Sequence, residues 1–195
     1  MKRFFDVVLS FLGLLVLFVP LIVVALLIKL DSPGPVFFRQ KRIGKGFRPF
    51  FIYKFRTMVE DAPRSGPVIT LGADPRITRV GRLLRKSKLD EVPQLLNVLR
   101  GDMSFVGPRP EIPQYVEMFR RDYEEILIVR PGITDLASLK YRDEAALLQN
   151  YPDPEAAYRK VILPDKIELA KQYLRRSSIL FDLQLMIRTL LKLAV

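Results

Sequence analysis

The chain begins with a long apolar stretch. Residues 7–28 contain no charged side chain, and these 22 positions would span roughly 33 Å as a helix, about the thickness of the hydrocarbon core of a bilayer. A cleaved secretory signal has an apolar run of about 7–15 residues that ends at a small-residue cleavage site. The run here is longer and ends in Ile-Lys-Leu-Asp-Ser-Pro. The pattern therefore predicts a membrane segment that stays with the protein.

The flanks and the centre of this stretch leave its topology open. Lys2 and Arg3 precede it and further basic residues follow it, whereas a helix that crosses a membrane carries its excess positive charge on the cytoplasmic side only. Pro20 lies near the midpoint, where it removes an intrahelical hydrogen bond and predicts a bend. A kinked single-pass helix and a re-entrant helix that returns to the same face both fit. The basic residues after the stretch are Lys29, Arg39, Lys41, Arg42 and Lys45.

Two short, aromatic-rich runs come next, at residues 36–38 and 50–55, with Gly-Lys-Gly at 44–46 between them. This arrangement predicts a small β-hairpin. After the hairpin, apolar positions recur at helical spacing instead. We therefore expect an α+β fold that is mostly helical.

Three helical stretches are expected in the middle of the chain. The first covers residues 77–86, with apolar side chains on one face and arginines and lysines on the other. The second begins near Asp90, has Pro93 in its first turn and stops at Gly101. The third covers about 110–126.

The C-terminal part, residues 165–193, mixes Leu, Ile and Phe with Lys and Arg. Its last section, 178–195, predicts a basic amphipathic helix. Such a helix can lie in a membrane interface, or it can pack its apolar face into the protein core. The residues leave both alternatives open.

Composition narrows the chemistry. The 195 residues include 32 Lys+Arg and 21 Asp+Glu, for a net charge of +11, and they contain neither Cys nor His. Thiolate nucleophiles, disulfides, Cys-ligated metal sites and imidazole general bases are therefore excluded. Any catalysis must use carboxylates, hydroxyls, Lys and Arg, with a hard cation such as Mg²⁺ as a compatible cofactor.

Asp90 and Glu91 are the first candidates for that chemistry. A carboxylate at a helix start is often only a cap that complements the helix dipole. Here, however, basic residues surround the helix start, and such a site suits a phosphate. Two carboxylates inside a phosphate site can hold Mg²⁺, or one can attack phosphorus. The nearby membrane segment points to a phosphorylated lipid as substrate. The surrounding basic residues are Arg79, Arg82, Arg85, Lys86, Lys88, Arg100 and Arg109.

Four sequence blocks, together with two shorter matches, resemble a known family. The chain is similar to the bacterial sugar transferases, and within them to the short-form monotopic phosphoglycosyl transferases. The resemblance covers nearly the whole chain in order. The blocks are KFRTM at 54–58, DPRITRVGRLLR at 74–85, LDEVPQLLNVL at 89–99 and GDMSFVGPRP at 101–110, with KRFFD at 2–6 and VRPGIT at 129–134.

The resemblance implies a reaction. Members transfer a sugar 1-phosphate from a nucleoside diphosphate sugar, commonly a UDP-sugar, to polyprenyl phosphate and release UMP, as the first step of glycoconjugate assembly. By analogy, Asp90 is the nucleophile that forms a phosphosugar intermediate, and Glu91 helps to position Mg²⁺, so both carboxylates belong to the expected metal site. The residues expected to bind substrate phosphate are Lys54, Arg56, Thr57, Arg85 and Arg109.

The resemblance also implies a topology. Residues 1–30 would form a re-entrant membrane helix broken at Pro20, and residues 31–195 would form a catalytic domain on the cytoplasmic face of the bacterial inner membrane. Interfacial amphipathic helices would hold this domain against the phospholipid bilayer. A homo-oligomer is compatible with this arrangement, and no nucleic acid partner is expected.

One segment departs from the family pattern. Residues 135–138 read Asp-Leu-Ala-Ser, where many relatives have Gly-Trp-Ala-Gln, and this loop is expected to help select the nucleotide or sugar. Two other functions fit the residues. A lipid phosphatase would use Asp90 with water as acceptor, and a membrane-anchored basic module would bind anionic lipid or nucleic acid without catalysis. The basic charge fits the second alternative, but no nucleic-acid-binding motif is present.

Overall fold

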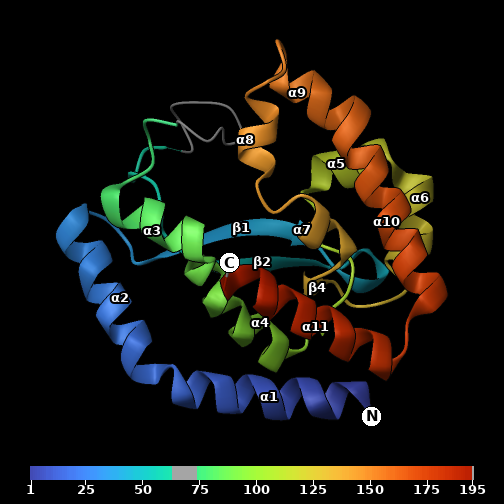
Figure 1. Cartoon of the computed structure of the whole chain (residues 1–195), viewed down its shortest axis with the longest axis horizontal. Coiled ribbons are helices and arrows are strands. Elements are labelled where there is room, and N and C mark those ends of the chain that lie inside the picture. Colours follow the sequence, from blue (N-terminus) through green and yellow to red (C-terminus); the bar gives the residue numbers. More distant parts are fainter. Residues whose placement is uncertain (63–73, 195) are drawn as a thin grey trace.

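The computed structural model describes residues 1–62 and 74–194. It has an α+β fold in which helices surround a two-stranded hairpin (Figure 1). The first two helices, α1 (Lys2–Val16) and α2 (Phe18–Asp31), follow one another along the outside of the molecule. They meet at Leu17 with a bend of 62°.

Pro20 accounts for the position of this bend. Proline has no N–H to donate to the carbonyl of Val16, and its ring crowds that carbonyl, so a continuous helix is interrupted one turn earlier. The predicted bend is confirmed. Within residues 1–62 and 74–194, no single helix is long and apolar enough to cross a bilayer, but the bent pair meets both conditions together.

Polar side chains on α1 attach it to the rest of the fold. Lys2 Nζ donates to Asp182 Oδ2 (2.6 Å), and Arg3 donates to the carbonyls of Val98 and Leu99 (2.5 and 2.9 Å). Further along, Asp6 is buried and accepts from Ser104 Oγ and from the Phe105 amide. The other side of α1 exposes apolar residues, among them Phe4, Phe11, Leu15 and Val16.

The predicted hairpin is confirmed. Strands β1 (Phe37–Ile43) and β2 (Pro49–Phe55) pair antiparallel, with Phe37 opposite Phe55. The buried amide of Asn97 fastens β2 to the following helices, because it donates to the carbonyl of Phe51 (2.8 Å) and accepts from the amide of Tyr53 (3.0 Å).

The helices after the hairpin follow the predictions with some differences. The stretch at 77–86 is α3 (Arg79–Ser87), capped by Thr78. The helix expected from Asp90 is a 3₁₀ turn over Leu89–Gln94 and only then α4 (Leu95–Arg100), which ends at Gly101 with a φ of 93°. Pro93 explains the 3₁₀ turn, because it lacks the N–H that an α-helix would use there.

The stretch at 110–126 was expected to be one helix, and this is wrong. It forms α5 (Pro113–Met118) and α6 (Arg120–Ile126), separated at Phe119, whose backbone is not helical. Proline at the first helical position sets the start of α5. Between α4 and these helices lies β3 (Ser104–Val106), which pairs in parallel with β4 (Gly132–Thr134).

The C-terminal part forms the main core with α5 and α6. The predicted stretch at 165–193 forms two helices, α10 (Leu163–Arg176) and α11 (Ile179–Ala194), and residues 177–178 between them are not helical. A π-helical turn over Tyr158–Ile162 leads into α10. The remaining helices are α7 (Leu136–Lys140), α8 (Glu144–Leu148) and α9 (Pro154–Ala157).

Helix α11 runs above α1 in the view of Figure 1, and its Asp182 accepts a hydrogen bond from Lys2 of α1. Its Leu185 is fully buried and packs with Val106 and Tyr173, so of the two alternatives left open the core-facing one holds for one face. The opposite face exposes Ile179, Leu180, Leu183, Ile187, Leu190 and Leu191. Helix α11 therefore has an apolar face that the described residues leave uncovered.

Candidate active site

A cleft of about 1190 Å³ opens between the hairpin, the 3₁₀ turn at Leu89–Gln94, the α7–α8 segment and the end of α11. All seven residues predicted to react with or bind substrate phosphate line it. These are Lys54, Arg56, Thr57, Arg85, Asp90, Glu91 and Arg109. Pro20 is not among the lining residues.

The backbone around α3 brings the predicted residues together. Gly81 packs against the end of β2, where a Cβ atom would come within 2.1 Å of the Thr57 carbonyl oxygen. Only glycine permits this approach. Lys88 then ends α3 in the left-handed conformation, with a φ of 57°, and turns the chain directly into the 3₁₀ turn that carries Asp90 and Glu91.

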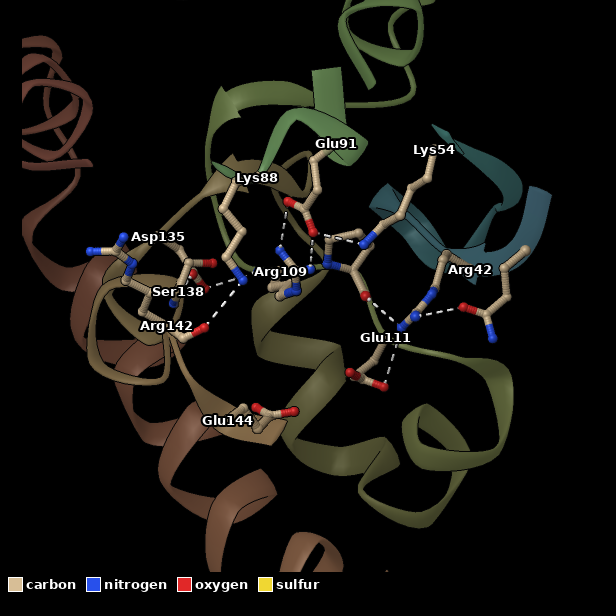
Figure 2. Close-up of polar contacts among 12 residues, drawn as sticks. Arg42, Lys54, Lys88, Glu91, Arg109, Glu111, Asp135, Ser138, Arg142 and Glu144 are labelled. Carbon is tan, nitrogen blue, oxygen red and sulfur yellow. Dashed lines mark hydrogen bonds and ion pairs between the residues drawn. The ribbon is translucent and has the colours of Figure 1, made fainter. Parts of the chain in front are cut away.

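Glu91 is held between two cations (Figure 2). Its Oε1 accepts from Lys54 Nζ at 2.7 Å and from Arg109 Nη2 at 2.6 Å. Burial alone would raise the pKa of this carboxyl group, but the charges and hydrogen bonds of Arg109 and Lys54 outweigh burial and hold the pKa well below its ordinary value. Burial in turn lowers the pKa of Lys54. Glu91 is therefore a carboxylate that is already paired.

Asp90 has a different environment from its neighbour. Its side chain is 8% exposed, and its Oδ1 atom is buried without a hydrogen-bond partner. Burial raises the pKa of Asp90, and the nearby Lys54 charge only partly opposes this effect. A buried, unpartnered carboxylate oxygen costs free energy, and such an atom in a cleft is available to a ligand.

Arg85 and Thr57 form a second pair on the cleft wall. Arg85 Nε donates to Thr57 Oγ1 at 2.8 Å. Burial lowers the pKa of the Arg85 guanidinium, although Arg85 still carries a positive charge. The cleft thus places two arginines and a lysine around the two carboxylates, as the sequence predicted.

Arg56 also lines the cleft, but its guanidinium is engaged elsewhere. It donates to the carbonyl of Pro33 (2.6 Å) and to the carbonyl and hydroxyl of Ser32 (2.7 and 2.9 Å). These bonds tie the end of α2 to the end of β2. In this structure the Arg56 guanidinium therefore binds the connection between α2 and β1.

The segment that departs from the family pattern lies beside Arg109. Asp135 is buried, accepts from the Arg109 amide (3.1 Å) and caps α7 by accepting from the Ser138 amide (2.6 Å). Lys88 Nζ donates to the Arg142 carbonyl (3.1 Å) (Figure 2). This bond links the start of the turn that carries Asp90 and Glu91 to the chain after α7. Asp135 thus holds the backbone of Arg109, an arginine that the sequence predicts to bind phosphate.

The sequence interpretation missed part of the cleft. Arg42, Glu111, Glu144, Tyr158 and Lys166 also line it. They come from β1, from the residues just before α5, from α8 and from the C-terminal region, and no local pattern joins them. The available signal was the position of Glu111, directly after the block at 101–110.

The predicted metal site was Asp90 and Glu91. Mg²⁺ is commonly held by one or two carboxylates together with substrate phosphates and water. The free Oδ1 of Asp90 fits this donor set, whereas Glu91 is occupied by Lys54 and Arg109. Within residues 1–62 and 74–194, no group of three acidic side chains is arranged to hold a metal. A cation here would need oxygen ligands from the substrate.

The fold and the cleft define a class of protein: an α+β protein with a bent apolar helix pair and a cleft in which Lys and Arg side chains surround an Asp-Glu dyad. The bacterial sugar transferase family model matches residues 1–195, so the chain belongs to this family. The resemblance stated from the sequence is confirmed.

Individual relatives carry more specific names. The chain is 47% identical over 142 residues to the UDP-N-acetylgalactosamine-undecaprenyl-phosphate N-acetylgalactosaminephosphotransferase of Aeromonas hydrophila, across 71% of this chain and 33% of that protein. It is 37% identical over 198 residues to the UDP-glucose:undecaprenyl-phosphate glucose-1-phosphate transferase of Escherichia coli (strain K12), across 98% of this chain and 40% of that protein. The chain spans less than half the length of these two relatives.

A third relative is closer in length. The uncharacterized sugar transferase EpsL of Bacillus subtilis (strain 168) is 34% identical over 195 residues, which cover 100% of this chain and 88% of that protein.

Proposed function

We propose that this protein transfers a sugar 1-phosphate from a UDP-sugar to undecaprenyl phosphate or a similar polyprenyl phosphate. The names of the Aeromonas and Escherichia relatives support the two substrates. The observation that carries the proposal is the unpartnered Oδ1 of Asp90, which lies beside a paired Glu91 in a cleft lined by Lys54, Arg85 and Arg109.

In the first half-reaction, an Asp90 carboxylate oxygen attacks the phosphorus that bears the sugar. The bond from this phosphorus to the oxygen of the other phosphate breaks, and UMP leaves with that oxygen. The product on the enzyme is an aspartyl phosphosugar. Arg85 and Arg109 are positioned to stabilise the negative charge that develops on the phosphoryl oxygens.

In the second half-reaction, a phosphate oxygen of the polyprenyl phosphate attacks the same phosphorus. The Asp90–phosphorus bond breaks, the Asp90 carboxylate is restored, and a lipid-linked diphosphate sugar is released. Two anionic substrates therefore use one site in turn, and their mutual repulsion inside the cleft is avoided.

Glu91 has a positioning role in this proposal. It orients Lys54 and Arg109, each through a hydrogen bond of 2.6–2.7 Å. Mg²⁺, held by Asp90 with substrate oxygens, would neutralise charge on the diphosphate. The Asp90 oxygen without a partner supports such a ligand.

The proposed location is the cytoplasmic face of the bacterial inner membrane, with α1 and α2 re-entering on one side. The support comes from the polar ends of this pair. Lys2 and Arg3 at the start of α1 bond to α11 and α4, while Asp31 at the end of α2 accepts from the Val80 amide on α3 (2.9 Å). Both ends of the pair are thus attached to the same body. The exposed apolar face of α11 is proposed to lie in the membrane interface.

A turnover assay tests the proposal. Purified protein in nanodiscs with undecaprenyl phosphate is given UDP-glucose or UDP-N-acetylgalactosamine, and UMP is measured. UMP release that needs the lipid for multiple turnovers supports transfer, and its loss in chelator supports the metal. Steady UMP release without lipid would contradict transfer and identify a hydrolase, whereas no UMP from any donor would contradict both.

A further inference from the structure

The cleft has a second polar end, which differs in formal charge from the end that holds Asp90 and Glu91. We call the latter the phosphate end. We call the second end the neutral pocket and define it as Arg42, Glu111, Glu144, Tyr158 and Lys166, all of which line the cleft. It holds two carboxylates and two cations, so its formal charge is zero. The phosphate end has Lys54, Arg85 and Arg109 against Asp90 and Glu91, and its formal charge is +1.

Hydrogen bonds and ion pairs link all five residues of the neutral pocket. Glu111 Oε1 accepts from Tyr158 Oη (2.9 Å), and Glu111 Oε2 lies 3.5 Å from Arg42 Nη1. Lys166 Nζ lies 3.4 Å from Tyr158 Oη and pairs with Glu144. Glu111 is 8% exposed, and burial together with Glu111 holds the pKa of Tyr158 far above its ordinary value, so this hydroxyl stays protonated.

The neutral pocket adjoins the dyad. Arg109, whose guanidinium binds Glu91, is separated from Glu111 only by Pro110, and Arg42 Nη1 donates to the Pro110 carbonyl (3.0 Å). In Figure 2, Glu91 and Lys54 lie on one side of Arg109, while Glu111 and Glu144 lie on the other. A ligand bound by the dyad thus reaches the neutral pocket without leaving the cleft.

One polar atom in this pocket has no protein partner. Arg42 Nε is buried and makes no hydrogen bond. An N–H in that state costs free energy unless a ligand accepts from it. Glu111 Oε2 already accepts from Arg42 and from the Ile112 amide, whereas Oε1 accepts from Tyr158 alone and can accept a second hydrogen bond. The pocket therefore offers a donor and acceptors at no net charge.

These features fit an uncharged ring that carries several hydroxyl groups. Carboxylates repel phosphate, but they accept hydrogen bonds from hydroxyls, and cations beside them supply donors to the same ring. We propose that the neutral pocket binds the sugar ring of the nucleotide sugar and that Glu111 is a specificity-determining residue. The inference rests on the proposed function.

The reaction sequence favours the sugar over the ribose as the ring that occupies this pocket. The sugar is bonded to the phosphorus that Asp90 attacks, so it stays beside the dyad through both half-reactions, whereas the nucleotide leaves after the first. A pocket that begins two residues from Arg109 suits the group that stays.

The test compares wild type with Glu111→Gln, which keeps the shape of residue 111 and removes its charge. UDP-glucose, UDP-galactose, UDP-N-acetylglucosamine and UDP-N-acetylgalactosamine are each assayed with undecaprenyl phosphate, and UMP is used separately as a competitive inhibitor. For the preferred donor we expect kcat/KM to fall about tenfold to a hundredfold, the range for a lost hydrogen bond to a charged group. The ratio between C4-epimeric donors should change, and inhibition by UMP should not.

One further variant is a control, and another replaces Glu111→Gln if that variant is unstable. Glu117→Gln makes the same chemical change at an exposed position on α5 that does not line the cleft, and it should behave as wild type. If Glu111→Gln melts far below wild type, Tyr158→Phe replaces it, because this change removes only a hydroxyl that donates to Glu111. The same donor ratios and UMP inhibition then decide the inference.

Four results would overturn it. An equal fall in kcat/KM for all four donors would show a structural role only, and unchanged kinetics would show no role. Weaker inhibition by UMP in Glu111→Gln would assign the pocket to the nucleoside. If wild type itself releases no UMP from any donor, the proposed function fails and this inference fails with it, an outcome distinct from an active wild type whose donor preference ignores Glu111.

Discussion

Asp90 and Glu91 are neighbours in sequence with opposite electrostatic environments. Glu91 accepts hydrogen bonds from Lys54 and Arg109, and its pKa is held well below the ordinary value. Asp90 has a buried oxygen without a partner, and burial raises its pKa. Two carboxyl groups whose pKa values are driven apart by their surroundings commonly have different tasks. The proposed task of Glu91 is to orient Lys54 and Arg109, and the proposed task of Asp90 is to react.

Asp90→Asn tests the proposed reactivity of Asp90 and the cost in stability of its buried charge. Turnover should fall by more than about a thousandfold, because the amide cannot act as the nucleophile. In metal-free buffer the melting temperature should rise. A carboxyl group whose folded pKa is raised is destabilising once it ionises, so at neutral pH the Asp90 charge costs stability that a neutral amide does not.

Turnover and differential scanning fluorimetry give the two readouts. Asp153→Asn is the matched control, because Asp153 is exposed, does not line the cleft and caps α9, a role that asparagine fills equally well. A variant that still releases UMP at a normal rate would exclude Asp90 as the nucleophile.

Glu91→Gln should change stability in the opposite direction. Its folded pKa is lowered, so Glu91 contributes stability that is fully present above its unfolded pKa and is lost only as the pH falls through the lowered value. At neutral pH the glutamine leaves Lys54 and Arg109 without their shared partner, at a cost of about 3–5 kcal/mol for a buried pair broken on one side. Chemical or thermal unfolding at pH 7 measures this loss. Equal stability of Glu91→Gln and wild type would mean that the pairing of Glu91 contributes little.

The sequence identified which residues would line the site, but not what each would contact. Lys54, Thr57, Arg85, Asp90, Glu91 and Arg109 were found because they fall within contiguous blocks. The engagement of Arg56 with Ser32 and Pro33, and the isolation of Asp90 Oδ1, depend on side-chain orientation in the folded chain. Glu111 and Tyr158 meet only because α10 and its preceding turn pack over the residues before α5.

At the scale of elements, α1 and α2 differ in their relation to the rest of the protein. Helix α1 presents Lys2, Arg3 and Asp6 to the fold. Helix α2 is apolar almost throughout and packs against the fold along one side, through Leu21, Val24, Ala25 and Ile28. Because of the bend at Leu17, α1 lies against α4 while α2 lies against α3 (Figure 1). The bend therefore determines whether both ends of the pair reach the same body.

Pro20→Leu should shift this pair toward a spanning topology. Leucine restores the N–H and removes the ring clash, so a continuous helix of α1 and α2 becomes favourable, although the polar contacts of α1 oppose it. The chain has no cysteine, so a cysteine added before Met1, where the chain is 91% exposed, is unique. Labelling with a membrane-impermeant maleimide in right-side-out and inverted vesicles reports its side.

In wild type, this cysteine and a separate Lys45→Cys reference should label from the same side. In Pro20→Leu, a fraction of the N-terminal cysteine should label from the opposite side, and Pro152→Leu in the exposed loop before α9 should match wild type. An N-terminal cysteine that stays on the reference side in both proteins would show that Pro20 does not set the topology.

Long periodic elements were predictable, and short ones were not. The hairpin was predicted from its aromatic runs on either side of Gly-Lys-Gly, and α3 and α11 from helical patterns over nine or more residues. The parallel pair of β3 and β4 has three residues in each strand, and α7, α8 and α9 have five or fewer, too few to show a period. Of these short elements, β3, β4, α7 and α8 contribute residues to the cleft, and Glu144 of α8 belongs to its neutral pocket.

At the scale of the whole molecule, the site and the apolar surfaces belong to one body. The apolar faces of α1 and α11 are exposed, and the cleft is lined by Leu9 and Leu17 of the helix pair as well as by Asp90. A lipid phosphate that approaches along these helices meets apolar side chains first and the cations of the cleft afterwards. A net charge of +11 favours approach to an anionic membrane and to anionic substrates.

The central claim is that Asp90 becomes bonded to phosphorus. Intact-mass spectrometry of the protein mixed with donor alone, without lipid and quenched under conditions that preserve acyl phosphates, tests it most directly. The account predicts a mass gain equal to one sugar phosphate in wild type and no gain in Asp90→Asn, with the gain removed on addition of undecaprenyl phosphate. A wild-type protein that turns over donor in the presence of lipid but never gains mass with donor alone would contradict it.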